Sequence, residues 1–237
     1  LHTAGELVRI LLHTLLRIGN VNLPEQFQRF FVGSNDSLHH RAAETGVEVH
    51  QTCTLTLGLK GEQLSDYAAL KAAGVTALSD DGRPVPTEEL MKTALIKAKE
   101  ADLPVVSHCE DLAIINGGII NQGKVSEILG VKGMDRLSED SITERDLQIA
   151  LETGAQLHIC HVSTRGSTDA VRKAKAAGGN ISCETAPHYF LLTEELLMRR
   201  DADYRMNPPL RTPDDVAAIK EGILDGTIDC IITDHAP

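Results

Sequence analysis

Positive charge is scarce in this sequence. The 237 residues contain 23 lysines and arginines against 34 aspartates and glutamates, which gives a formal net charge of −11. A protein that binds the phosphate backbone of nucleic acids needs a basic face that displaces counterions, so the composition argues against that class. Arg83 and Arg211 could attract a small anionic ligand, but pairing with surface acids is the favoured interpretation of both.

Three other patterns are missing. The five cysteines are an odd number without a C-x-x-C pair, which favours a reducing compartment, the cytoplasm, over a disulfide framework. No segment reaches the roughly 18 uninterrupted apolar residues expected of a membrane span. The glycine pairs at residues 117–118 and 178–179 stand outside any G-x-G-x-x-G pattern, so they predict turns or helix caps and not a phosphate-binding loop.

From about residue 47 onward, short β-branched runs alternate with helical patterns. Such alternation predicts parallel strands joined by crossover helices, and six strands indicate most of an eight-stranded barrel. We therefore expect the α/β class and a TIM-like (β/α)8 barrel that is incomplete in this chain. Residues 1–46 show no clear strand and stay unassigned, whereas residues 47–237 are expected to form one barrel domain of about six strand–helix units. The predicted strands are residues 47–55, 75–79, 104–108, 156–161, 180–184 and 227–233.

Capping residues predict where the helices begin. Thr212 followed by Pro213 supplies an N-cap and a proline at the first helical position, where the missing N–H costs nothing. Residues 114–133, rich in polar residues and glycine, read as a long loop, with a lid over the active site as a hypothesis. The predicted helices are residues 87–101, 143–153, 167–177 and 212–224.

Polar side chains follow four of the predicted strands. Asp81, His108, His161 and Asp234 each stand at or just beyond a carboxyl end, which is the edge where parallel barrels place their active sites. Any one of them could simply cap a helix or satisfy a loop. Imidazole and carboxylate are suitable ligands for a borderline divalent ion such as Zn²⁺, so the four together predict a metal site.

Around these residues the sequence resembles the type I dihydroorotases of the amidohydrolase superfamily. The segments occur in the family's order and cover about residues 47–237. Each segment is modest by itself, and the ordered set is specific. The matching segments are SDDGRP (79–84), SHCED (107–111), HICHVST (158–164), NPPLR (207–211) and TDHAP (233–237), with weaker matches at GLKGE (58–62) and ETAPH (184–188).

The resemblance implies a zinc-dependent hydrolase of cyclic amides. It implies that Asp81 bridges two zinc ions, that His108 and His161 hold one of them, and that Asp234 contacts the other and carries the proton. Asn207 matches a substrate-binding position. The substrate would be dihydroorotate or N-carbamoyl-L-aspartate of pyrimidine biosynthesis, and a homo-oligomer or a complex with aspartate transcarbamoylase is the implied assembly.

One family feature is missing from the sequence. Members supply two further metal ligands from an H-x-H pair on the first barrel strand, and no H-x-H occurs here. Adjacent His39 and His40 would point to opposite faces of a strand and substitute poorly. We expect the chain to be part of a longer protein that carries the pair upstream.

Two alternatives stay open. A hydantoinase, dihydropyrimidinase or allantoinase would share the barrel, but such enzymes commonly bridge their metals with a carbamylated lysine, and residues 75–79 contain none. A non-catalytic scaffold for aspartate transcarbamoylase would explain the missing H-x-H. Retention of four convergent ligands argues against a scaffold, which has no need of them.

Several neighbouring residues are interpreted as structural. His158 lies three residues before His161, and this odd offset predicts that it faces the helices. His235 could support Asp234 by a hydrogen bond. Cys109 has no identifiable activating base, so it is not expected to be a nucleophile.

Overall fold

The computed structural model describes residues 49–235 of the chain, and the unassigned segment 1–46 lies outside these described residues. Six strands form one sheet in the order β1-β2-β3-β6-β7-β8, and every neighbouring pair is parallel. All six predicted strands are therefore confirmed, each shorter than or as long as predicted. Their bounds are β1 Thr52–Cys53, β2 Ala77–Leu78, β3 Val105–Ser107, β6 Leu157–Ile159, β7 Ile181–Thr185 and β8 Cys230–Ile231.

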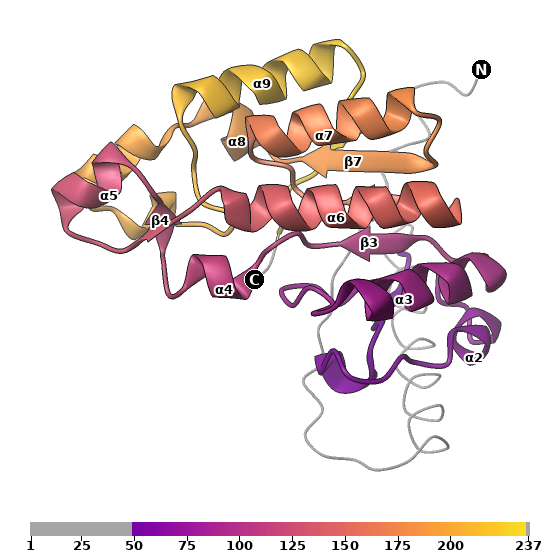
Figure 1. The fold of residues 1–237 in the computed structure, drawn as a ribbon. Helices are drawn as coiled ribbons and strands as arrows, with labels where there is room; N and C mark the ends of the chain where they lie inside the picture. The colour runs from indigo at the N-terminus through magenta and orange to yellow at the C-terminus, as the bar shows by residue number, and fades with distance from the viewer. Residues whose placement is uncertain (1–48, 236–237) are drawn as a thin grey trace.

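Helices connect the strands and three of the longest lie side by side over one face of the sheet (Figure 1). These three are α3 (Glu88–Glu100), α6 (Leu137–Thr153) and α7 (Arg165–Ala176). The order strand, helix, parallel strand is that of a (β/α) barrel, in which crossovers are right-handed and helices cover the outside. The remaining helices are α2 Tyr67–Ala72, α4 Leu112–Ile115, α5 Lys124–Leu129, α8 Pro187–Leu191 and α9 Pro213–Leu224, with 3₁₀ turns at Leu57–Leu59, Glu194–Arg199 and Ala202–Tyr204.

The predicted caps operate at two helices. Thr212 and Asp215 form a reciprocal capping box at the start of α9, directly before Pro213. The Thr87 side chain accepts a hydrogen bond from the backbone N–H of Leu90 at the start of α3. These contacts satisfy N–H groups that have no partner inside the helix.

Two predicted helix starts were wrong. Helix α6 begins at Leu137, six residues before the predicted start at Thr143, which lies buried inside the helix. Helix α7 begins at Arg165 because Thr164, and not Ser167, provides the cap. Several Ser, Thr and acidic residues stand close together around each helix start, so the sequence offers more than one start. The N-cap of α6 is Arg136, whose side chain makes no capping hydrogen bond, and the N-cap of α7 is Thr164.

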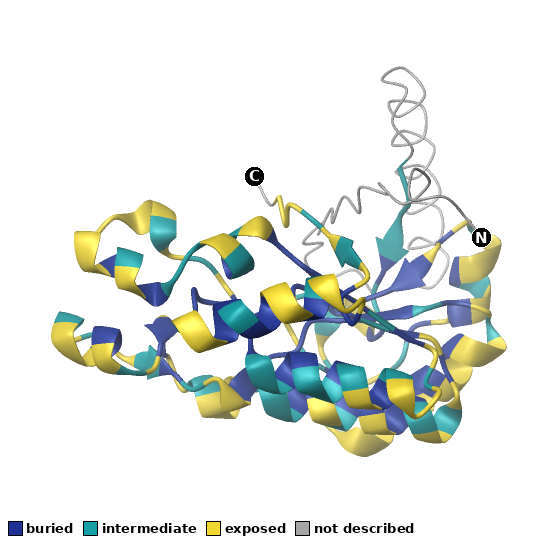
Figure 2. Ribbon diagram, turned by 90° about the horizontal axis from the view of Figure 1, so that it is seen from above, coloured by how far each residue is buried: buried dark blue, intermediate teal, exposed yellow. Residues whose placement is uncertain are grey.

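The main core lies between the sheet and the helix layer. Leu78, Val105 and Leu157 from three adjacent strands are fully buried against this layer, and buried positions gather along the sheet–helix interface in Figure 2. The opposite face of the strands carries a separate small cluster of Ala77, Val106 and Cys160. Because side chains alternate across a strand, these two clusters define an outer and an inner face of the sheet.

Residues 114–133 are not the structureless loop that their composition predicts. They contain α5 and a small parallel ribbon of β4 (Ile120–Asn121) and β5 (Gly133–Met134). Gly118 allows the ribbon to close, because a Cβ there would lie 2.4 Å from the Gly133 carbonyl oxygen. The ribbon packs at one end of the molecule (Figure 1). In the part of the chain that the structure describes, no helix has the length and apolar character needed to cross a membrane.

Candidate metal centre

Three of the four predicted ligands meet at the carboxyl edge of the sheet. Asp81 follows β2, His108 follows β3 and His161 follows β6, and these strands are neighbours in the sheet. One ligand atom from each residue lies within 4.8 Å of the ligand atoms of the other two. Both histidines are buried, and Asp81 is partly buried. The fold thus brings together residues separated by up to 80 positions in the sequence.

The distances suit one shared cation. His108 Nδ1 lies 2.9 Å from His161 Nε2 and 3.5 Å from Asp81 Oδ1. The two imidazole rings meet edge to face, with centroids 4.7 Å apart and an interplanar angle of 81°. Two histidine nitrogens bound to one tetrahedral zinc ion lie about 3.3 Å apart, given Zn–N bonds near 2.0–2.1 Å. A small separation of the two rings would therefore admit the ion.

The backbone at His161 explains how its ring reaches this group. On a regular strand His161 would share the helix-facing side with Leu157 and Ile159. Its φ angle is 30°, in the left-handed region that residues other than glycine rarely adopt. The strand's alternation ends there, so the His161 side chain turns towards His108. Backbone strain of this kind is common at functional sites.

Glu110 contacts the other side of the His108 ring. Its Oε2 lies 3.4 Å from His108 Nε2, and its Oε1 accepts a hydrogen bond from the Asn207 side-chain amide at 2.9 Å. Metal-binding histidines commonly donate their second ring N–H to a carboxylate, which fixes the tautomer. Glu110 was not among the site residues predicted from the sequence, although it lies inside the SHCED segment two residues after His108.

The charges around His108 are negative. Burial by itself would lower the pKa of His108, but the bond to Glu110 and the charges of Glu110, Asp81 and Asp234 raise it overall. Burial would raise the pKa of Glu110, yet the hydrogen bonds from His108 and Asn207 and the nearby positive charges lower it overall. The His108 shift favours a protonated imidazole and the Glu110 shift favours an ionised carboxylate, so the carboxylates around His108 form a negative environment that also suits a bound cation.

Asp234 lies near the three-residue group but is not a member of it. It follows β8, is exposed, and has a φ of 51°. Its negative charge contributes to the raised pKa of His108, which places it within electrostatic range of that ring. His235 is also exposed. The role assigned to Asp234 by resemblance therefore stays a prediction.

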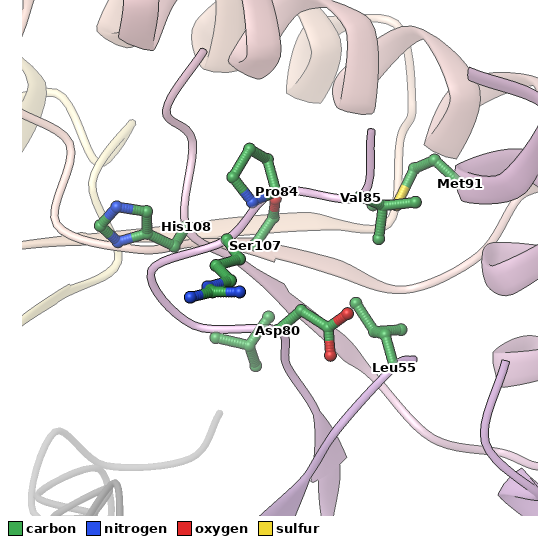
Figure 3. A pocket seen from close by; sticks show the side chains of 9 residues that line it. Leu55, Asp80, Pro84, Val85, Met91, Ser107 and His108 are labelled. Atoms are coloured by element: carbon green, nitrogen blue, oxygen red, sulfur yellow. The ribbon is translucent and has the colours of Figure 1, made fainter. Parts of the chain in front are cut away.

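Adjacent Asp80 serves a different purpose from Asp81. Its buried carboxylate accepts hydrogen bonds from the backbone N–H of Thr56, at 3.1 Å, and from the Thr56 hydroxyl. Burial raises the pKa of Asp80 despite these bonds. Asp80 and His108 both line a narrow pocket, together with the exposed Arg83 (Figure 3). Of these two adjacent carboxylates, that of Asp80 therefore binds Thr56 in the loop after β1, and that of Asp81 belongs to the metal group.

Arg211 is not a surface residue that pairs with surface acids. Its side chain is 2 % exposed and donates to Glu139 Oε2 at 3.0 Å, to Asn121 Oδ1 at 2.9 Å and to Ser163 Oγ at 3.0 Å. Asn121 belongs to the β4–β5 ribbon, and Ser163 follows the ligand His161. Arg211 therefore joins helix α6, strand β4 and the loop after β6, and its charge lowers the pKa of Glu110 in the candidate metal centre.

Comparison with known proteins places this site in a family. The family model described as "Dihydro-orotase-like" matches residues 33–167. A dihydroorotase from Geobacter metallireducens is 51% identical over 195 residues, 82% of this chain and 46% of that protein. One from Syntrophotalea carbinolica is 48% identical over 199 residues, 84% of this chain and 47% of that protein. The chain belongs to the dihydroorotase-like family. It spans slightly less than half of each relative's length.

Solved structures similar to this dihydroorotase-like chain confirm the fold class. A D-hydantoinase covers 93% of the chain with a TM-score of 0.69 at 18% identity, and the chain spans 49% of that structure. The dihydropyrimidinase from Brevibacillus agri covers 81% with a TM-score of 0.64 at 20% identity, and the chain spans 44% of it. The expected amidohydrolase (β/α) barrel, incomplete in this chain, is therefore confirmed. At these identities the likeness concerns the fold alone.

Proposed function

We propose that this chain forms the metal-binding part of a zinc-dependent dihydroorotase, which interconverts N-carbamoyl-L-aspartate and dihydroorotate in pyrimidine biosynthesis. One observation carries the proposal: Asp81, His108 and His161 meet within 4.8 Å at the ends of three neighbouring strands. They do so in a chain whose relatives, 48–51% identical to it, are named dihydroorotase. The substrate class is inferred from the names of these relatives, and the metal-dependent chemistry is inferred from the three clustered side chains.

The residues present fit a zinc ion. Asp81, His108 and His161 offer one carboxylate and two imidazoles. Glu110 contacts Nε2 of His108, the ring nitrogen that does not face the group. By resemblance, Asp81 would also contact a second ion together with Asp234. The bound metal supplies a strong nucleophile at neutral pH and polarises the amide carbonyl.

The chain's own residues handle the proton and the substrate. Opening the cyclic amide adds water across its C–N bond, so one proton must pass to the departing ring nitrogen. We infer that exposed Asp234 accepts that proton and delivers it, as a general base followed by a general acid. In the ring-closing direction the same transfers run in reverse. Arg83, exposed beside His108, provides a positive charge for an anionic substrate.

Asn207 takes part through its amide. Its Nδ2 group binds Glu110 at 2.9 Å, while its carbonyl oxygen is a potential acceptor for a substrate N–H group. A substrate-binding role therefore requires the amide to bridge the ligand-orienting carboxylate and the substrate. This arrangement would couple substrate binding to the position of His108.

A substrate panel tests the proposal. The full chain, purified with Zn²⁺, should hydrolyse dihydroorotate faster than hydantoin or allantoin, and Asp81→Asn should abolish turnover. A matched control is Asp102→Asn, because Asp102 is exposed just beyond the C-terminal end of α3, where it pairs with Lys71. Faster turnover of hydantoin would reassign the chain to a hydantoinase-type activity.

The absence of an H-x-H pair from the sequence favours one rival function, a non-catalytic scaffold for aspartate transcarbamoylase. Metal analysis separates the two functions. A zinc content that is lower in Asp81→Asn than in the wild type supports the enzyme, whereas a zinc content that Asp81→Asn leaves unchanged, together with a stable complex with the transcarbamoylase, supports the scaffold. We place the protein in the cytoplasm, because all five cysteines are free thiols.

A further inference from the structure

A second group of potential metal ligands lies on the inner face of the sheet. It consists of His158 on β6, Glu184 on β7 and Cys230 on β8, three neighbouring strands. Glu184 and Cys230 are direct cross-strand partners. Asp81, His108 and His161 do not belong to this group, and the function proposed above does not use it.

The face on which His158 lies differs from the sequence-based interpretation. His158 pairs with Val106 on β3 and with Ser182 on β7. Val106 packs with Ala77 and Cys160 and not with the helix-covered core, so His158 faces inwards. The interpretation was wrong because it assumed that the strand's alternation continues to His161, where the left-handed backbone breaks it.

The imidazole of His158 is held with one nitrogen aimed at the group. Its Nδ1 makes a 2.8 Å hydrogen bond with Ser182 Oγ. Its Nε2 lies 3.1 Å from Glu184 Oε2, yet it is buried without a properly oriented hydrogen bond to any described residue. When Nδ1 donates its proton to Ser182, the Nε2 lone pair faces the carboxylate. The Nε2 lone pair of His158 and the carboxylate oxygen of Glu184 then repel each other, and a cation bound between them would remove this repulsion.

Cys230 adds a sulfur ligand to this arrangement. One ligand atom from each of the three residues lies within 4.8 Å of the others. Burial, followed by the charges of Glu184 and Asp229, raises the pKa of the Cys230 thiol to about 12. The free thiol is therefore protonated at neutral pH, and a bound cation must displace its proton. Thiophilic cations do this readily, whereas Mg²⁺ and Ca²⁺ do not.

We propose that His158, Glu184 and Cys230 bind one thiophilic divalent cation of the Zn²⁺ or Cd²⁺ class, separately from the Asp81 group. Binding forms one metal–nitrogen, one metal–oxygen and one metal–sulfur contact, and it releases the thiol proton to solvent. A water molecule completes the usual four-coordinate geometry. Because the three ligands lie on β6, β7 and β8, the bound cation would link these strands and should stabilise this end of the sheet.

Cobalt spectroscopy tests the site. Co²⁺ added to the metal-free full chain should produce a near-ultraviolet thiolate-to-cobalt charge-transfer band, which the Asp81 group cannot produce because it contains no thiolate. The band should disappear in Cys230→Ala and persist in Asp81→Asn. Cys183→Ala is the matched control, because Cys183 is a buried thiol on β7 that faces the helices. A wild-type chain without the band, or a band that persists in Cys230→Ala, would overturn the proposal.

A second measurement guards against a variant that does not fold. His158→Gln keeps a polar side chain, and it should lower Cd²⁺ affinity by more than about 100-fold. Cd²⁺ should raise the Tm of Asp81→Asn, whose first metal group is disabled, but not that of the double variants Asp81→Asn with His158→Gln and Asp81→Asn with Cys230→Ala. One proton should be released for each Cd²⁺ bound at this site. Equal Tm shifts in Asp81→Asn and in both double variants would refute the assignment.

Discussion

The side-chain amide of Asn207 donates a hydrogen bond to Glu110, 97 residues earlier in the chain, with 2.9 Å between the two atoms. The other carboxylate oxygen of Glu110 lies 3.4 Å from His108 Nε2. These two contacts connect the segment that follows the 3₁₀ turn Ala202–Tyr204 to one of the candidate metal ligands. The orientation of His108 therefore depends on a carboxylate whose own position is fixed from a distant loop.

Replacing Glu110 by Gln should weaken metal binding at the Asp81 group. The variant loses the negative charge that faces His108 Nε2, and such changes commonly lower metal affinity about 10–100-fold. Competition with a chromophoric chelator measures this affinity. Glu127→Gln on α5 is the matched control, because Glu127 is exposed and does not belong to the Asp81 group. Unchanged affinity in Glu110→Gln would show that Glu110 does not position the ligand.

Asp234→Asn should separate metal binding from turnover. Asp234 is exposed and stands outside the three-residue group, so the ion held by Asp81, His108 and His161 should remain. Loss of the proton carrier should lower kcat by about 10²–10⁴-fold. Metal content and steady-state kinetics are measured on the same preparation, with the exposed Asp102→Asn as the control. Near-normal turnover in Asp234→Asn would remove Asp234 from the mechanism.

Arg211→Met should destabilise the protein by about 3–5 kcal/mol, because it leaves the buried Glu139 carboxylate without its partner. The free energy of unfolding from denaturant titration measures the loss. In the double variant Arg211→Met with Glu139→Gln, the total cost should be smaller than the sum of the two single costs.

Arg172→Met is the surface comparison for this experiment. Arg172 pairs with Asp169 and Asp225 at the protein surface, where an ion pair contributes about 1 kcal/mol or less. Equal losses for Arg211→Met and Arg172→Met would mean that burial does not strengthen the Arg211–Glu139 interaction.

Buried Asp146 should make the stability depend on pH. It accepts hydrogen bonds from Ser107 Oγ at 2.7 Å and Arg145 Nε at 2.8 Å, yet burial outweighs these contacts and raises the pKa of its carboxyl group. The folded state then binds the proton more tightly than the unfolded state. The free energy of unfolding should therefore fall as the pH rises from about 4, the unfolded value, through the raised folded value.

Asp146→Asn removes this titration. The difference in unfolding free energy between the wild type and the variant should shift against the wild type as the pH rises across that window. Denaturant titrations at several pH values, after identical chelator treatment, measure the shift. The exposed Asp102→Asn variant is measured in parallel as the surface comparison. A constant difference between the wild type and Asp146→Asn would show that the Asp146 carboxyl does not titrate abnormally.

The sequence by itself determined the six strands, their order and the residues at their carboxyl ends. Strand signals are local, because β-branched runs and capping residues act over a few positions. Placing Asp81, His108 and His161 after strands was therefore enough to expect them at one edge. That expectation matches the cluster that the fold brings within 4.8 Å.

Only the tertiary structure decided which side chains face one another within that frame. The left-handed backbone at His161 turns its ring away from the side that regular alternation would give it, and His158 faces inwards, against the prediction. Arg211 is buried because Glu139, 72 residues away, provides a partner there, and Glu110 gains its role through Asn207. Such directions depend on single backbone angles and on partners far apart in the chain, and neither is encoded in a local pattern of residue types.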